Sequence, residues 1–235
     1  MTIRVCVSVP PKTVEEAFDL IKKAETQLAD LIEVRLDYLT THDRITKIPS
    51  SSKTPLIATN KSTAQHGHFS GTETQRQKIL LNAARNGFNY VNVDLGTPKQ
   101  AELISKLHKT GAKVIVSFHD FEKTPALSRL RKALKEEVAL GADVCKIITT
   151  AQSVKDNLKA LDFVTEASKK VKLVCFAMGE LGKHSRMMSP VFGAFFTFAC
   201  LDEKRKTAKG QLTIQEMNLA YETLGLKQND SQRKK

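Results

Sequence analysis

Hydrophobic and polar positions along this chain follow two alternating periods. Short runs of β-branched and small apolar residues, typical of buried strands, recur between longer segments whose apolar residues are spaced three or four apart, as in amphipathic helices. Such alternation predicts an α/β fold, and eight repeats favour a single (β/α)8 TIM barrel over an open doubly wound sheet. The predicted strands are 3–9, 31–37, 55–60, 90–95, 113–120, 141–150, 172–178 and 193–201.

Helix starts and the limits of the domain follow from local signals. Thr13 with Glu16, like 72–75 and 213–216, has the spacing of a capping box, which marks the first turn of a helix. Further helices are expected at about 98–109, 125–140 and 154–170, whereas 179–186 is expected to be a loop. No linker divides the chain, so 1–225 is predicted to be one barrel domain. The polar segment 226–235 has no apolar period and is predicted to be a frayed tail.

Composition and charge narrow the functional class. The 235 residues carry a formal net charge of +12, but the lysines are dispersed and aromatic residues are few, which favours a small anionic substrate over nucleic acid. No apolar run is long enough to cross a membrane and no signal pattern opens the chain, so a cytoplasmic protein without a membrane partner is expected. The four cysteines form no CxxC pair, so neither a zinc site nor a redox motif is indicated.

A lysine within a predicted buried strand is the first candidate for chemistry. Lys146 shares one face of the strand with Val144 and Ile148, and we expect apolar neighbours around it. Burial disfavours the charged form of an amine, and a neutral amine attacks carbonyl carbon to give a Schiff base. The alternative is a structural lysine whose ammonium reaches water at the strand end.

Polar side chains near the ends of three other predicted strands could share this site, because barrel enzymes act at the carboxyl ends of their strands. Glu33 and Arg35, with Asp37, occupy one face that is predicted to point into the barrel, although a structural ion-pair network is the alternative. His119, one strand before Lys146, could carry protons or be structural. Arg186, in the expected loop, could bind a carboxylate or be an ordinary solvated arginine.

Six short motifs carry a resemblance to a known family. EVRLD, SFHDF, ADVCKI, AMGELGKHSR, VFGAFFTF and TAKGQ, in this order, resemble the type I 3-dehydroquinate dehydratases, the Schiff-base enzymes of the shikimate pathway. The resemblance implies removal of water from 3-dehydroquinate to give 3-dehydroshikimate. It also implies a (β/α)8 barrel that acts as a homodimer without a metal or an organic cofactor.

The resemblance further implies a role for individual residues. Lys146 matches the Schiff-base lysine and His119 the general acid/base, while Arg186, helped by Gln211, matches the arginine that binds the substrate carboxylate. Glu33 and Arg35 match the pair that orders the substrate hydroxyls, and Met178, Phe121 and Phe198 match apolar pocket walls. Lys61 and Thr207 stand at further substrate-binding positions, Thr207 where a serine or threonine hydroxyl is expected.

Two departures from the family pattern fall after the third predicted strand. Lys61 stands where an arginine is usual and lacks its planar fork. Gln65 stands where a glutamate is usual, so electrostatic support for a protonated His119 is expected to be absent there. Two other functions remain open, a different Schiff-base barrel lyase such as a class I aldolase and a basic nucleic-acid-binding barrel without catalysis.

Overall fold

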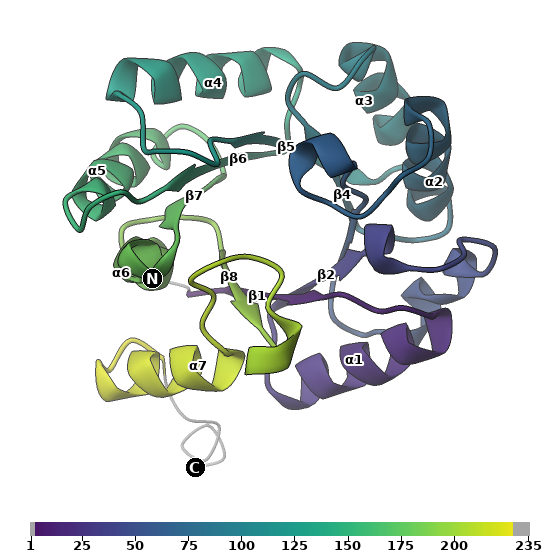
Figure 1. The fold of residues 1–235 in the computed structure, drawn as a ribbon, viewed down its shortest axis with the longest axis horizontal. Helices are drawn as coiled ribbons and strands as arrows, with labels where there is room; N and C mark the ends of the chain where they lie inside the picture. The colour runs from purple at the N-terminus through teal and green to yellow at the C-terminus, as the bar shows by residue number, and fades with distance from the viewer. Residues whose placement is uncertain (1–2, 228–235) are drawn as a thin grey trace.

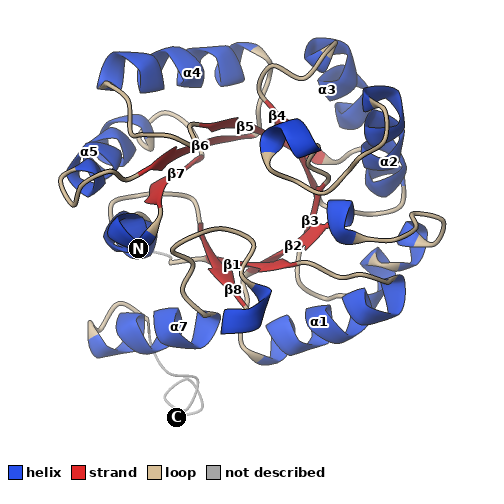
Figure 2. Ribbon diagram, in the orientation of Figure 1, coloured by secondary structure: helices blue, strands red, loops and turns tan. Residues whose placement is uncertain are grey.

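A computed structural model describes residues 3–227. Eight parallel strands form one sheet that curls into a barrel, and the helices surround it (Figures 1 and 2). This confirms the predicted (β/α)8 fold. Neighbouring strands pair in the order β7-β6-β5-β4-β3-β2-β1-β8. Their bounds are β1 Val5–Val9, β2 Leu31–Arg35, β3 Leu56–Thr59, β4 Tyr90–Asp94, β5 Lys113–His119, β6 Val144–Thr150, β7 Leu173–Met178 and β8 Thr197–Cys200.

The two edges of the sheet come together beside β8. Val5 of β1 is in register with Thr197 of β8. On the other side, the backbone N–H of Phe195 donates to the carbonyl of Leu173 in β7 at 2.7 Å. The sheet therefore forms a nearly closed ring, and the carboxyl ends of all eight strands face one opening.

Side-chain caps fix where several helices begin. The Thr13 side chain accepts from the N–H of Glu16, and reciprocal capping boxes join Thr72 to Gln75 and Thr213 to Glu216, as the sequence predicted. The helices are α1 Val14–Thr26, α2 Glu73–Arg85, α3 Gln100–His108, α4 Leu127–Ala139, α5 Asp156–Ala167, α6 Lys183–Met188 and α7 Ile214–Thr223.

Three local predictions were wrong or only partly right. Arg186 lies in the short helix α6 rather than in a loop, because six residues are too few to show a helical period in the sequence. Asp37 lies in a 3-10 turn, Leu36–Tyr38, after β2 instead of within the strand. Of the predicted tail, Leu226 packs on the core and Lys227 Nζ lies 3.4 Å from Asp30, while 228–235 fall outside the described residues.

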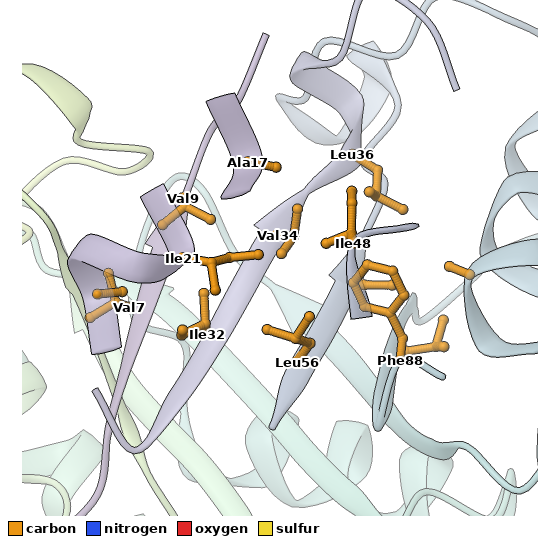
Figure 3. Packing of buried hydrophobic residues seen from close by; sticks show 14 of the residues in the cluster. Val7, Val9, Ala17, Ile21, Ile32, Val34, Leu36, Ile48, Leu56 and Phe88 are labelled. Atoms are coloured by element: carbon orange, nitrogen blue, oxygen red, sulfur yellow. The ribbon is translucent and has the colours of Figure 1, made fainter. Parts of the chain in front are cut away.

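Apolar side chains fill both sides of the sheet. On the outer side, Val7, Ile32 and Val34 of the strands meet Ala17 and Ile21 of α1 (Figure 3). On the inner side, apolar residues close the floor of the barrel and leave polar residues to the carboxyl end. These floor residues include Cys6, Leu31, Ile57, Tyr90, Ile115, Val144, Val174 and Phe196. Within residues 3–227, no helix is long and apolar enough to cross a membrane.

One buried acid links α4 to the strand that carries Lys146. Glu137 is 0% exposed, and its Oε2 accepts from the backbone N–H of Lys146 at 3.1 Å. Burial raises the pKa of Glu137 well above its usual value, although hydrogen bonds from the backbone oppose the shift. A raised folded-state pKa means that the folded protein binds the proton more tightly. The contribution of the Glu137 carboxyl to the free energy of unfolding is therefore present at acidic pH and lost as pH rises through its folded-state pKa.

Replacing this acid by an amide should stabilise the protein in a pH-dependent way. In Glu137→Gln, the amide oxygen still accepts from Lys146, but no ionisation opposes folding. We expect its unfolding temperature to exceed that of the wild type by more at about pH 8 than at about pH 5. Glu136→Gln, at the half-buried neighbouring position, is the control. An equal shift at both pH values would show that Glu137 does not titrate as described.

Candidate active site

The carboxyl ends of the strands surround a cavity of about 510 Å³. Its floor is the apolar barrel interior, and its upper wall is made by the loops that follow the strands. All eleven site residues predicted from the sequence line this one cavity. They are Lys146, His119, Glu33, Arg35, Lys61, Arg186, Thr207, Gln211, Met178, Phe121 and Phe198.

Lys146 lies in the middle of β6 with its side chain inside the barrel. Its Nζ is 4.3 Å from the ring centroid of Phe198 and 3.7 Å from Oε1 of Glu33. Burial lowers the pKa of Lys146. Glu33 opposes that shift, and the nearby Lys61 cation adds to it. The expectation of purely apolar neighbours was wrong, because Glu33 comes from β2 on the opposite side of the barrel.

Glu33 stays ionised despite its burial. Burial alone would raise its pKa, but Lys146, Arg35 and two hydrogen bonds together lower it. Ser8 Oγ donates to Oε2 at 2.5 Å, and Thr59 Oγ1 donates to Oε1 at 2.8 Å. The carboxylate is thus fixed by β1 and β3, one strand on either side of its own. A fixed charge beside Lys146 can stabilise a cation that forms on the lysine nitrogen.

Arg35 is held by a carboxylate of its own. Its Nε and Nη2 donate to the two oxygens of Asp37 at 2.9 and 2.7 Å. Burial would lower the pKa of Arg35, but Asp37 more than offsets this and raises it. Asp37 also accepts from the backbone N–H of His68 at 3.1 Å, which ties the segment after β3 to β2. The guanidinium is therefore rigid and already oriented toward the cavity.

His119 ends β5 and lies above Lys146. Its neighbour two residues back, Ser117, is in register with Lys146, so His119 sits roughly 7 Å closer to the cavity opening. The imidazole stacks on Phe121 with ring centroids 5.5 Å apart and an interplanar angle of 9°. Burial lowers the pKa of His119 well below its usual value, and Lys61 and Lys146 add to the shift. His119 is therefore a neutral base at neutral pH.

Arg186 is a buried cation without an ionic partner. It is 1% exposed and stacks over Phe176 at 4.2 Å, and within residues 3–227 no carboxylate pairs with it. Its Nε has no hydrogen-bond partner, and Nη2 makes one long contact of 3.4 Å to the Lys209 carbonyl. Burial lowers the pKa of Arg186 to about 9. An anionic ligand would supply the missing charge and acceptors.

Gln211 and Thr207 shape the loop after β8. The Gln211 Oε1 accepts from the backbone N–H of Thr207 at 2.7 Å and of Ala208 at 3.3 Å. Thr207 Oγ1 lies 3.2 Å from Ser8 Oγ, which joins the loop to the hydrogen bonds around Glu33. Both polar side chains thus border the cavity and are held in place by neighbours.

Asp94 is a site residue that the sequence analysis missed. It ends β4 and accepts from Lys61 Nζ at 2.5 Å, and its Oδ1 lies 3.9 Å from Nδ1 of His119. Gln65 is a neutral amide, whereas Asp94 brings a carboxylate near His119 from another strand. The signal was present in the sequence, because Asn92 and Asp94 alternate with apolar residues up to a strand end.

Comparisons with known proteins agree with this geometry. A family model, "Type I 3-dehydroquinase", matches residues 5–228. A 3-dehydroquinate dehydratase of Methanosarcina barkeri is 34% identical over 221 residues, 89% of this chain and 91% of the relative. Another, of Dehalococcoides mccartyi, is 36% identical over 204 residues, 87% and 89% of the two chains.

A solved structure extends the likeness to three dimensions. The type I 3-dehydroquinate dehydratase of Clostridium difficile, with covalently modified comenic acid, has a TM-score of 0.83 at 25% identity and covers 94% of this chain and 92% of its own. The fold and the cavity are those of a (β/α)8-barrel enzyme. The chain belongs to the type I 3-dehydroquinase family.

Within residues 3–227, no group of three or more histidine, cysteine, aspartate or glutamate side chains is arranged to hold a metal ion. All four cysteines are free and buried. Three cations of the cavity instead lie beside carboxylates: Lys146 beside Glu33, Arg35 beside Asp37 and Lys61 beside Asp94. The chemistry that this arrangement offers is that of an amine nucleophile, a proton carrier and a binding site for an anion.

Proposed function

We propose that this chain is a 3-dehydroquinate dehydratase that converts 3-dehydroquinate to 3-dehydroshikimate through a Schiff base on Lys146. One observation carries the proposal. Buried Lys146, whose pKa is lowered, lies below the neutral His119. Arg186 lines the same cavity and lacks an anionic partner. A keto acid is the class of substrate that uses all three groups. The substrate of the family relatives has this chemistry.

The first steps build an electron sink on the substrate. The neutral amine of Lys146 attacks the ketone carbon, and loss of water gives an imine. Protonation of the imine gives an iminium ion, which Glu33 at 3.7 Å from the lysine nitrogen stabilises. The iminium withdraws electrons from the adjacent carbon 2 and makes its proton acidic.

The elimination then uses His119 twice. The imidazole removes the proton from carbon 2, and the electron pair forms an enamine. Collapse of the enamine expels the hydroxyl on carbon 1, and the imidazolium returns its proton to the leaving oxygen, so that water departs. Water then hydrolyses the product imine, which releases 3-dehydroshikimate and the free amine of Lys146. One histidine for both transfers implies elimination from a single face of the ring.

The remaining predicted residues orient the substrate. Arg186 binds its carboxylate, with Gln211 and Thr207 beside it on the loop after β8. Glu33 and Arg35 order the hydroxyls, and Lys61 provides a further donor. The apolar wall is formed by Met178, Phe121 and Phe198. Tight orientation of this kind lowers a barrier by several kcal/mol.

Loss of the unpaired guanidinium should weaken substrate capture. In Arg186→Met, we expect kcat/KM to fall about 10- to 150-fold, the value of a hydrogen bond to a charged group of about 1.5–3 kcal/mol. Arg186→Lys should recover only part of the loss, because an ammonium lacks the planar fork. Steady-state kinetics on 3-dehydroquinate would measure both. Wild-type kcat/KM in the methionine variant would mean that another group binds the carboxylate.

The test of the proposed function is a spectrophotometric assay. The product is a conjugated enone and the substrate is not, so wild-type enzyme mixed with 3-dehydroquinate should show rising enone absorbance. A barrel aldolase would consume the substrate without forming the enone. Absence of an enone signal with folded protein would contradict the proposal.

The assembly, the location and the partners of the protein stay predictions. The family resemblance predicts a homodimer, which sedimentation or light scattering would measure. A cytoplasmic location, and the absence of nucleic-acid partners, also remain predictions from the sequence.

A further inference from the structure

Asp94 lies where three side chains compete for one carboxylate oxygen. Asp94 is 3% exposed, and its Oδ1 accepts from Lys61 Nζ at 2.5 Å and from Ser117 Oγ at 3.1 Å. Nδ1 of His119 lies 3.9 Å from the same oxygen, too far for a hydrogen bond. Lys61 therefore occupies the acceptor that His119 would otherwise use.

The second carboxylate oxygen of Asp94, Oδ2, lies near the guanidinium of Arg76. Nη1 of Arg76, from α2, lies 3.8 Å from Oδ2, which itself makes no hydrogen bond. Arg76 is fixed by Glu73 at 2.7 Å and by the carbonyl of Asn60 at 2.8 Å. If Lys61 leaves, the carboxylate keeps one cation beside it. Its Oδ1 then accepts from Ser117 alone and can take a second donor.

The side chain of Lys61 borders two cavities into which its ammonium group could move. It lines the active-site cavity and also a second cavity of about 550 Å³, which Asp94 and Ser117 border. His119 lines both cavities too. The lysine nitrogen thus sits at the boundary, on a flexible stem with three donors. An oxygen-rich substrate in the active-site cavity offers it new acceptors.

We propose that Asp94 is the positioning residue of His119 and that Lys61 controls it. In this structure Lys61 Nζ donates to Oδ1 of Asp94. When substrate oxygens draw Lys61 away, Oδ1 accepts from Nδ1–H of His119. This fixes the tautomer whose Nε2 is unprotonated and able to act as the base. The inference rests on the proposed function for the identity of the substrate, but the Lys61–Asp94–His119 exchange can be measured without any ligand.

Replacement of Lys61 by His119 as the donor to Asp94 would change the pKa of His119. In this structure the pKa of His119 is lowered by burial and by nearby cations, Lys61 among them. Departure of Lys61 removes one cation and adds a carboxylate partner, and both changes raise the pKa. The histidine is thus a weaker base while Lys61 contacts Asp94 and a stronger one after Lys61 leaves. The charged groups around it are Lys61, Lys146, Arg35, Glu33, Asp94 and, behind Asp94, Arg76.

A double-mutant cycle on the ligand-free enzyme tests this. The pKa of His119 is followed by NMR of labelled histidine in wild type, Lys61→Met, Asp94→Asn and the double variant. Lys61→Met should raise the pKa and shift the ring ¹⁵N signals toward the Nδ1–H tautomer. In the Asp94→Asn background, the same lysine substitution should raise the pKa much less, since no carboxylate is left to accept. Lys113→Met, at the far end of β5, controls for loss of a lysine charge.

Turnover supplies a second readout. Asp94→Asn should lower kcat at least about tenfold, or about 1.4 kcal/mol of barrier, with little change in KM. If this variant does not fold, Lys61→Met alone carries the test through its NMR signals. An equal pKa rise in both backgrounds, or unchanged ring ¹⁵N signals in Lys61→Met, would overturn the proposal. Failure of the wild-type enone assay would instead overturn the proposed function and leave the NMR result intact.

Discussion

Turnover of 3-dehydroquinate is expected to fall at least about 10⁴-fold in Lys146→Ala, the scale seen when other covalent nucleophiles are removed. The reason is that the covalent step uses the Lys146 amine, which lies inside the barrel 3.7 Å from Oε1 of Glu33. Lys61 lies at the cavity boundary beside Asp94, and Arg186 is not a nucleophile. The enone assay on purified variant would measure the loss.

The fold should survive the substitution. Glu33 loses a cation at 3.7 Å but keeps Ser8 and Thr59 as hydrogen-bond donors. Lys146→Met preserves the volume and should be equally inactive, while Lys132→Met, at an exposed position of α4, is the matched control and should be fully active. Circular dichroism and thermal unfolding would verify the fold. Substantial dehydratase activity in folded Lys146→Ala would rule out the Schiff-base assignment.

The second large effect is expected in His119→Ala, with kcat lower by about 10²- to 10⁴-fold, the usual contribution of a positioned acid or base. Both imine formation and elimination should be slow, because His119 is the neutral proton carrier above Lys146. The variant should still form an adduct with substrate on Lys146, since the nucleophile is intact. Removal of the imidazole leaves no buried charge, so stability should change little.

Single-turnover kinetics would separate the steps in this variant. Adduct that accumulates without enone is the expected pattern. His108→Ala is the control, because that histidine lies half exposed on α3 and pairs with Asp143, far from the cavity. Normal turnover in His119→Ala would mean that another residue carries the proton.

Much of this site was predictable because alternate side chains of each strand point into the barrel. Glu33 and Arg35 share a parity in β2, as Lys146 does with the floor residue Val144 in β6, and all three face inward. His119 and Lys146 were predicted to be neighbours because their strands are consecutive, and β5 pairs with β6. The resemblance then assigned these residues to one reaction.

The sequence could not show contacts made across the barrel. Lys146 meets Glu33 from four strands away, so its environment is more polar than its own strand suggests. The contact of Lys61 with Asp94 joins two residues 33 positions apart, and nothing local marks it. For Arg186, the role was predicted from the sequence but the secondary structure was not. Its short helix has too few residues for a period, although its role as an anion partner was predicted.

Borohydride trapping tests the Schiff base on Lys146 most directly. Wild-type enzyme is reduced in the presence of 3-dehydroquinate, and the peptide that contains Lys146 is examined by mass spectrometry. A Schiff base on Lys146 predicts a stable mass increase on this residue, dependent on substrate, retained in His119→Ala and absent from Lys146→Ala. Enone formation by the wild type with no reducible adduct on Lys146, or an adduct on another lysine such as Lys61, would contradict it.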